Sequence, residues 1–145
     1  MTLPSCPITI GQRHLGSRCR ASIVRKYEPA RYPDVRIIVP HLGGTLPLLI
    51  QRVEDHLRRM AHGGESSAVT NPAEVIRTLY FDTVNNYGPA LRCAGAAFGS
   101  DHIMLGTDFP HLFVRPCVDY IERSGLRQSD IDPILDRSAQ RLLQV

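Results

Sequence analysis

Three short apolar runs recur along the chain, and residues that break regular structure bound each of them. The runs lie at 35–40, 78–82 and 103–107. The first is rich in β-branched residues and closes with a proline. Runs of this length and composition are typical of buried strands.

The segments between the runs have helical patterns. One helix is predicted from the apolar positions that share a face after Thr45, which are Leu46, Leu49, Ile50, Val53, Leu57 and Met60. Further helices are predicted from Pro72, over 89–98 up to Gly99, over 115–124 and near the C-terminus. Strands that alternate with helices in this way indicate an α/β fold with a parallel sheet.

Each predicted strand has a histidine or an aspartate at its C-terminal end. His41 follows the first run, Asp82 ends the second, and Asp108 follows the third. In a β/α barrel these strand ends form the active face, so side chains there are placed for chemistry. Two structural alternatives stay open, in which Asp108 caps the next helix and His41 is a turn residue. The recurrence at all three strands favours the chemical interpretation.

Composition bounds the size and class of the protein. At 145 residues the chain is shorter than the roughly 250 residues of a complete β/α barrel. With 43% hydrophobic and 21% charged residues it has the composition of an ordinary globular domain. We find neither an apolar run of about 20 residues nor a signal-peptide pattern, so we expect a cytoplasmic location and no membrane partner. The four widely spaced cysteines are expected to be reduced thiols.

Charge is distributed unevenly along the chain. Residues 1–35 carry six basic and two acidic residues, although the whole chain has a net charge of only +3. A basic arm for nucleic acid is one interpretation, but the segment lacks the interleaved aromatic residues of single-strand binders, so we expect no nucleic-acid partner. Residues 1–28 show no periodicity and stay unassigned, with disorder or an altered gene start as the alternatives.

Three motifs together resemble a known family. They are Val39-Pro40-His41-Leu42-Gly43-Gly44, Leu79-Tyr80-Phe81-Asp82-Thr83 and Gly106-Thr107-Asp108-Phe109-Pro110-His111. In order and spacing they resemble the C-terminal half of the amidohydrolase-related proteins, the metal-dependent barrels that include aminocarboxymuconate-semialdehyde decarboxylase and the resorcylate-type decarboxylases. The resemblance implies that residues 29–145 form the C-terminal part of a (β/α)8 TIM barrel, with about three parallel strands and flanking helices.

The resemblance also implies roles for individual residues. Asp108 corresponds to a ligand of the catalytic divalent metal, usually zinc, and His41 to the general acid/base. Arg52 resembles an arginine that reaches a substrate carboxylate, often across a dimer interface, although a solvated surface arginine is an equal alternative. Asp82 is expected to have a structural or supporting role, and His111 a packing or surface role.

Part of the family's metal site is missing from this sequence. The family needs a His-x-His after its first strand and a histidine after its fifth, and neither is found here. One carboxylate and one imidazole fall short of the three protein ligands usual for catalytic zinc. We therefore expect a fragment of a hydrolase or non-oxidative decarboxylase that acts on a small carboxylate-bearing substrate, with Zn²⁺ or another divalent metal bound only when the site is completed.

An incomplete barrel predicts partners. The first strand, 35–40, is expected to be an open edge, so we expect a homo-oligomer or association with a complementary half. The alternative function is a non-catalytic remnant or interaction module in which His41 and Asp108 are idle.

Overall fold

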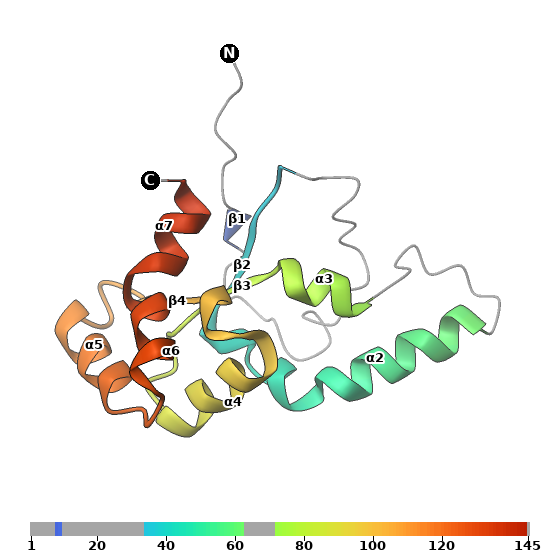
Figure 1. The fold of residues 1–145 in the computed structure, drawn as a ribbon, viewed down its shortest axis with the longest axis horizontal. Coiled ribbons are helices and arrows are strands. Elements are labelled where there is room, and N and C mark those ends of the chain that lie inside the picture. Colours follow the sequence, from blue (N-terminus) through green and yellow to red (C-terminus); the bar gives the residue numbers. More distant parts are fainter. Residues whose placement is uncertain (1–7, 10–33, 63–71, 145) are drawn as a thin grey trace, which may run out of the picture.

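The computed structural model describes residues 8–9, 34–62 and 72–144 (Figure 1). Four strands form one sheet in the order β1-β2-β3-β4, and every neighbouring pair is parallel. The strands are β1 Ile8–Thr9, β2 Ile37–Val39, β3 Tyr80–Asp82 and β4 Ile103–Met104. Parallel strands that follow one another in sequence order, with helical crossovers, have the arrangement of a barrel segment. The predicted fold class is therefore confirmed.

Helices connect the strands. They are η1 His41–Gly43, α2 Leu46–His62, α3 Pro72–Thr78, α4 Gly88–Phe98, η2 Ser100–His102, α5 Val114–Glu122, α6 Gln128–Asp132, the π-helical η3 Pro133–Arg137 and α7 Ser138–Leu143. In Figure 1 α5, α6 and α7 lie to the left of the strands, α3 to the right, and α2 and α4 below. The predicted helices are present, and Gly99, with φ 88°, ends α4 as expected. The strands lie where they were predicted but are shorter: β2 and β3 begin at residues 37 and 80 rather than 35 and 78, and β4 ends at residue 104 rather than 107.

The hydrophobic core lies between one face of the sheet and the helices. Ile37, Val39, Phe81 and Ile103 are buried against apolar residues of α2 to α6 and η3. The residues between them, Ile38 and Tyr80, are only half-buried. The alternation follows from the two-residue period of a strand. One face of the sheet is therefore covered by helices, and the other is less covered.

The expected open edge at β2 is wrong. Ile8 and Thr9 pair with Ile37 and Ile38, so β1 covers this edge. The rest of the unassigned N-terminal segment, 1–7 and 10–28, lies outside the described residues. On the outer side of β4, the Leu105 N–H donates to the carbonyl of Ile134 in η3 at 2.9 Å. Helix η3 therefore covers part of the opposite edge.

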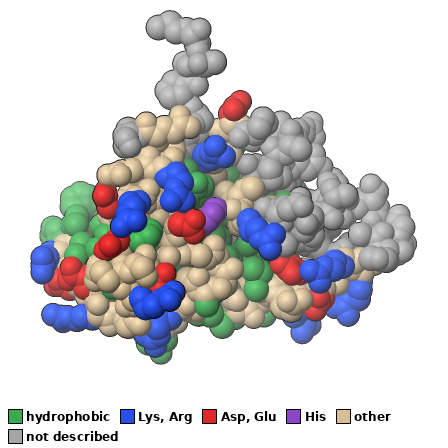
Figure 2. Space-filling view, viewed as in Figure 1, with side chains coloured by type: hydrophobic (Ala, Val, Ile, Leu, Met, Phe, Trp, Pro, Cys, Tyr) green, Lys and Arg blue, Asp and Glu red, His purple; other side chains and the backbone are tan. Residues whose placement is uncertain are grey.

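The surface carries charges of both signs. On the face shown in Figure 2, arginine side chains lie among aspartate and glutamate side chains. Several form ion pairs three or four residues apart on a helix, such as Arg58–Glu54 at 3.2 Å and Arg115–Asp119 at 2.9 Å. None of the described helices combines the length and apolar character that crossing a bilayer requires. Of the cysteines, Cys93 and Cys117 are free thiols, as predicted.

Candidate functional site

A sharp turn places His41 at the C-terminal end of β2. His41 and Leu42 both have positive φ, 57° and 53°, and φ is also positive at Gly43 and Gly44, 72° and 61°. A side chain at Gly43 would meet the Phe81 ring, because its Cβ would lie 3.0 Å from a ring carbon. Glycine is therefore needed at position 43, where η1 crosses the end of β3.

A hydrogen bond from the His41 ring shows which ring nitrogen carries the hydrogen. Nδ1 lies 2.6 Å from the backbone carbonyl oxygen of Val84. A carbonyl oxygen can only accept, so Nδ1 carries the hydrogen in this contact. Nε2 has no hydrogen-bond partner among the described residues. Nε2 is therefore the nitrogen available to gain and lose a proton.

Asp82 joins the β2 and β3 strand ends. It is the last residue of β3, and its Oδ1 accepts the backbone N–H of His41 at 2.7 Å and that of Val84 at 3.1 Å. Burial raises the pKa of the Asp82 carboxyl, whereas the two N–H donors and the His41 imidazole lower it and Asp108 raises it. A supporting role was predicted for Asp82, but the bond to His41 was not, because it joins residues 41 positions apart.

Asp108 lies in the turn after β4, with φ 54° and an exposed side chain. The alternative in which it caps the next helix is wrong: α5 begins at Val114, and its N-cap residue is Phe113. The Asp108 carbonyl accepts the N–H of His111, whose side chain is exposed. The Asp108 carboxylate is close enough to raise the pKa of Asp82. His41, Asp82 and Asp108 therefore share one end of the sheet, as predicted.

Arg52 is not joined to this cluster. It is exposed on α2, and within the described part of the chain no hydrogen bond or ion pair links it to His41, Asp82 or Asp108. A cavity of about 240 Å³ lies nearer to His41, between the start of α2 and α4. Its lining is mainly apolar and includes Leu42, Leu48, Tyr87 and Cys93. Sequence periodicity gave no signal for it, because its walls come from separate elements.

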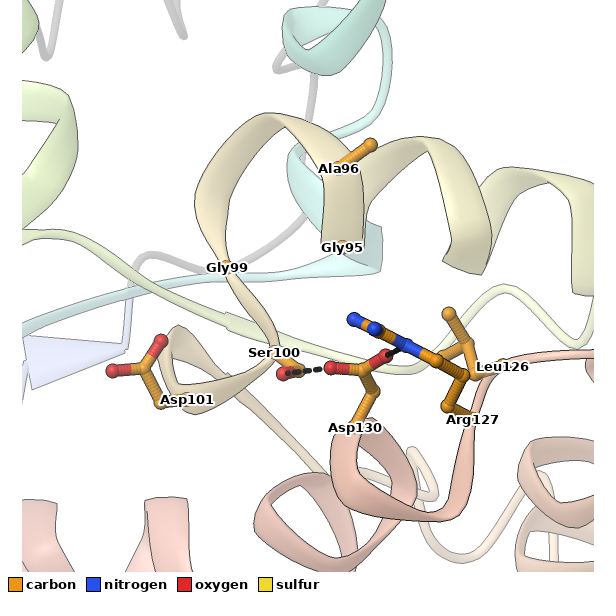
Figure 3. A pocket seen from close by; sticks show the side chains of 8 residues that line it. All are labelled: Gly95, Ala96, Gly99, Ser100, Asp101, Leu126, Arg127 and Asp130. Carbon is orange, nitrogen blue, oxygen red and sulfur yellow. Dashed lines mark hydrogen bonds and ion pairs between the residues drawn. The ribbon is translucent and has the colours of Figure 1, made fainter.

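A second cavity, of about 350 Å³, lies at the opposite end of β4 (Figure 3). Its polar residues bind one another: the Ser100 hydroxyl donates to Asp130 at 3.2 Å, and Arg127 Nε donates to the other Asp130 oxygen at 3.1 Å. At this same end His102 donates from Nδ1 to the Leu79 carbonyl at 2.9 Å. These groups have partners, so they give no sign of a second active site.

The described residues do not fit a complete catalytic metal site. Among them, no three His, Cys, Asp or Glu side chains lie close enough together to hold a metal ion. A catalytic zinc usually has three protein ligands and one open position. Asp108 is exposed and could supply one oxygen ligand, but the described part of the chain does not supply the rest.

Comparison with known proteins identifies the family. The sequence model described as Amidohydrolase matches residues 18–136, which is most of the chain and includes all three strand-end motifs. The chain belongs to the amidohydrolase family. The match begins at residue 18, upstream of residue 29, where the barrel segment was expected to begin, so this family relationship extends into the basic N-terminal segment.

Several decarboxylases of the amidohydrolase family are similar to this chain. The 6-methylsalicylic acid decarboxylase of Penicillium expansum is 38% identical over 81 residues, which is 55% of this chain and 25% of the relative. The solved 5-carboxyvanillate decarboxylase of Sphingomonas paucimobilis has a TM-score of 0.77 at 19% identity, over 89% of this chain and 39% of that one.

A dihydroxybenzoic acid decarboxylase from Polaromonas sp. JS666, crystallised with manganese and 2-nitroresorcinol, has a TM-score of 0.74 at 22% identity. The match covers 86% of this chain and 38% of that structure. At this level of identity the solved structures establish the fold alone. The chain spans less than two fifths of the length of each of these three relatives.

Proposed function

We propose that this chain contributes the acid/base histidine and one metal-ligating carboxylate to a metal-dependent, non-oxidative decarboxylase of small aromatic carboxylates. The observation that carries the proposal is the fixed His41 ring, whose Nε2 stays available at the strand end that also holds Asp82 and Asp108. The similar proteins named above are decarboxylases, which favours this reaction over hydrolysis.

His41 would supply the proton that replaces carbon dioxide. The ring carbon that bears the carboxylate takes a proton from Nε2 of the doubly protonated imidazole. The bond to the carboxylate carbon then breaks, its electron pair stays with the ring, and carbon dioxide leaves. His41 regains its proton from solvent. Since Nδ1–H stays bound to the Val84 carbonyl, only Nε2 changes its protonation during this cycle.

The remaining parts of the site are assigned by proposal. Asp108 would be one ligand of a divalent metal, for which both zinc and manganese are candidates, since manganese is present in the Polaromonas structure. The other ligands would come from residues outside the described part or from a complementary chain. Arg52 would bind the substrate carboxylate only in such an assembly, because no contact joins it to His41 here. The cytoplasmic location stays a prediction.

Carbon dioxide release tests the proposal. The chain is incubated with Mn²⁺ or Zn²⁺ and with 6-methylsalicylate or 2,6-dihydroxybenzoate, alone and with the preceding segment of the Penicillium relative supplied as a separate chain. We expect release in at least one mixture, and its loss in His41→Ala. If no mixture exceeds the His41→Ala background, the chain is not a decarboxylase component.

The incomplete set of metal donors among the described residues favours one alternative, a non-catalytic interaction module. The two functions differ in metal content after dialysis against excess Mn²⁺ or Zn²⁺. A module would stay free of metal both alone and in every assembly. The proposed enzyme component would retain metal once assembled, and Asp108→Ala would remove it.

A further inference from the structure

Two separate hydrogen bonds tie His41 to the segment that follows β3. Its backbone N–H donates to Asp82 Oδ1 at 2.7 Å, and its ring Nδ1–H donates to the Val84 carbonyl at 2.6 Å. The same Asp82 oxygen accepts the N–H of Val84 at 3.1 Å. One carboxylate oxygen therefore holds the backbone of His41 and also the residue that accepts from its ring.

These hydrogen bonds stabilise a backbone conformation of His41 that would otherwise be unfavourable. With φ of 57°, His41 lies in the left-handed region, which is unfavourable for a residue with a Cβ. Without a partner for the His41 N–H, relaxation of His41 toward negative φ would lower the free energy of the turn. The hydrogen bond from the His41 N–H to the Asp82 carboxylate opposes this relaxation, because breaking it would leave a part-buried donor and acceptor without each other. Asp82 thus selects the backbone conformation from which the His41 ring reaches Val84.

The position of Asp82 is itself fixed by β4. A Cβ on Gly106 would lie 2.8 Å from the Asp82 Cβ and 3.0 Å from a Val84 methyl, so only glycine allows this approach. Beside it, the Thr83 N–H donates to the Met104 carbonyl at 3.1 Å, and Thr83 Oγ1 accepts the N–H of Gly106 at 3.1 Å. These contacts hold residues 82–84 against β4.

We propose that Asp82 is a positioning residue, which holds His41 in the single tautomer and orientation that leave Nε2 free for proton transfer. The catalytic role of Asp82 rests on the proposed function, whereas its effect on the His41 tautomer does not. A local Asx-turn would explain only the bond to Val84. It does not explain the hydrogen bond from the His41 N–H to Asp82, which joins residues 41 positions apart.

The tautomer of His41 can be measured without any activity. In the ¹⁵N-labelled 145-residue chain, long-range ¹H–¹⁵N correlations at a pH where the imidazoles are neutral distinguish Nδ1–H from Nε2–H. We expect His41 to be in the Nδ1–H form in the unmodified chain and in Asp82→Asn, whose amide oxygen still accepts. We expect a mixture of tautomers in Asp82→Ala and in Asp82→Leu, which keeps the branched shape of the side chain but accepts no hydrogen bond.

His102 is the internal control. It also donates from Nδ1 to a backbone carbonyl, but its acceptor is Leu79 and no bond joins it to Asp82. His102 should keep its tautomer in every variant. An unchanged His41 tautomer in both Asp82→Ala and Asp82→Leu, or a mixed one in Asp82→Asn, overturns the proposal. Loss of the ordered signals of both histidines in Asp82→Ala and Asp82→Leu also overturns it, since Asp82 would then serve folding alone.

Activity in the assembled enzyme tests the catalytic half of the inference. Asp82→Leu should lower kcat by about 10- to 100-fold, with little change in KM. This is the usual effect of replacing a residue that orients a metal ligand or base by a hydrogen bond. Asp82→Asn should restore most of kcat. An equal kcat in Asp82→Leu and the unmodified enzyme contradicts the catalytic role. If no assembly is active while the tautomer changes as expected, the proposed function fails and the positioning role stands.

Discussion

The two ends of the sheet carry the same kinds of residue but use them differently. His41, Asp82 and Asp108 lie at the C-terminal ends of the strands, and His102, Asp101 and Asp130 lie near the start of β4. At the N-terminal end both carboxylates face an arginine, through the pairs Asp101–Arg141 at 3.2 Å and Asp130–Arg127 at 3.1 Å. At the C-terminal end neither carboxylate has an arginine or lysine partner among the described residues.

The two ends also differ in backbone conformation, with non-glycine residues at positive φ near the C-terminal end. His41, Leu42 and Asp108 have positive φ, whereas the residue with positive φ beside His102 is Gly99, which adopts it without strain. Strained backbone persists only where the surroundings hold it, and it collects at functional sites. Residue type alone therefore does not distinguish a functional site from a stabilising cluster. What distinguishes them is whether the polar groups satisfy one another.

The two histidines give the largest expected difference. In an active assembly, His41→Ala should lower kcat by about 10²- to 10⁴-fold, because it removes the proton donor. His102→Ala should leave kcat nearly unchanged and lower the free energy of unfolding by about 1–3 kcal/mol, because the Leu79 carbonyl loses its donor. Steady-state kinetics and urea unfolding of both variants check this. Similar kcat losses in the two variants would remove the distinction between the two ends.

The aspartates should differ in metal retention. Asp108→Ala should reduce the metal held by the assembled protein at least about 10-fold, since a direct ligand matters no less than its supporting residues. Asp101→Ala removes an exposed ion pair and should retain the metal. Elemental analysis after dialysis measures both. Retention of metal by Asp108→Ala would show that Asp108 is not a ligand.

Two glycines should respond to alanine with opposite signs. Gly106→Ala places a methyl 2.8 Å from the Asp82 Cβ, and such overpacking costs about 1–3 kcal/mol. Gly95, on the second cavity, would place its methyl 3.8 Å from Leu126, an ordinary contact. Because Gly95 lies inside helix α4, alanine there should stabilise the fold by about 0.5–1 kcal/mol. Urea unfolding gives both values, and a stabilised Gly106→Ala would show that β3 and β4 can move apart.

Much of this fold could be predicted from the sequence because it is encoded locally. Short apolar runs of strand length are a local signal, so His41, Asp82 and Asp108 could be assigned to strand ends. The amphipathic stripe after Thr45 likewise specifies α2. The features that the sequence could not provide depend on partners distant in the chain. Strand β1 is two residues, Ile8 and Thr9, in a segment without periodicity, and only pairing with β2 defines it.

The same reason explains which site details were missed. The bond from His41 to Asp82 depends on how closely η1 approaches β3, which the glycine at position 43 permits but does not specify. The cap alternative for Asp108 failed because the turn after β4 continues for several residues before α5 begins. Arg52 was placed correctly on a helix, but the helical period alone does not say which groups outside the helix it meets.

The smallest expected effect concerns the pH dependence of stability. Burial raises the pKa of Asp82 above its ordinary value of 3.8, so the folded chain keeps this proton at pH values where the unfolded chain has lost it. The contribution of Asp82 to the free energy of unfolding should therefore decrease as pH rises from 3.8 through the raised pKa, and stay level above it. Urea unfolding of the unmodified chain and of Asp82→Asn across this range isolates the contribution, because the other groups largely cancel in the difference.

The charged groups near Asp82 are His41, which lowers the pKa of Asp82, and Asp108, which raises it. The Asp108→Ala background should therefore end the window at a lower pH. If the stability of the unmodified chain instead rises relative to Asp82→Asn over the window, the two N–H donors outweigh burial, and the C-terminal strand end is as well satisfied as the N-terminal one.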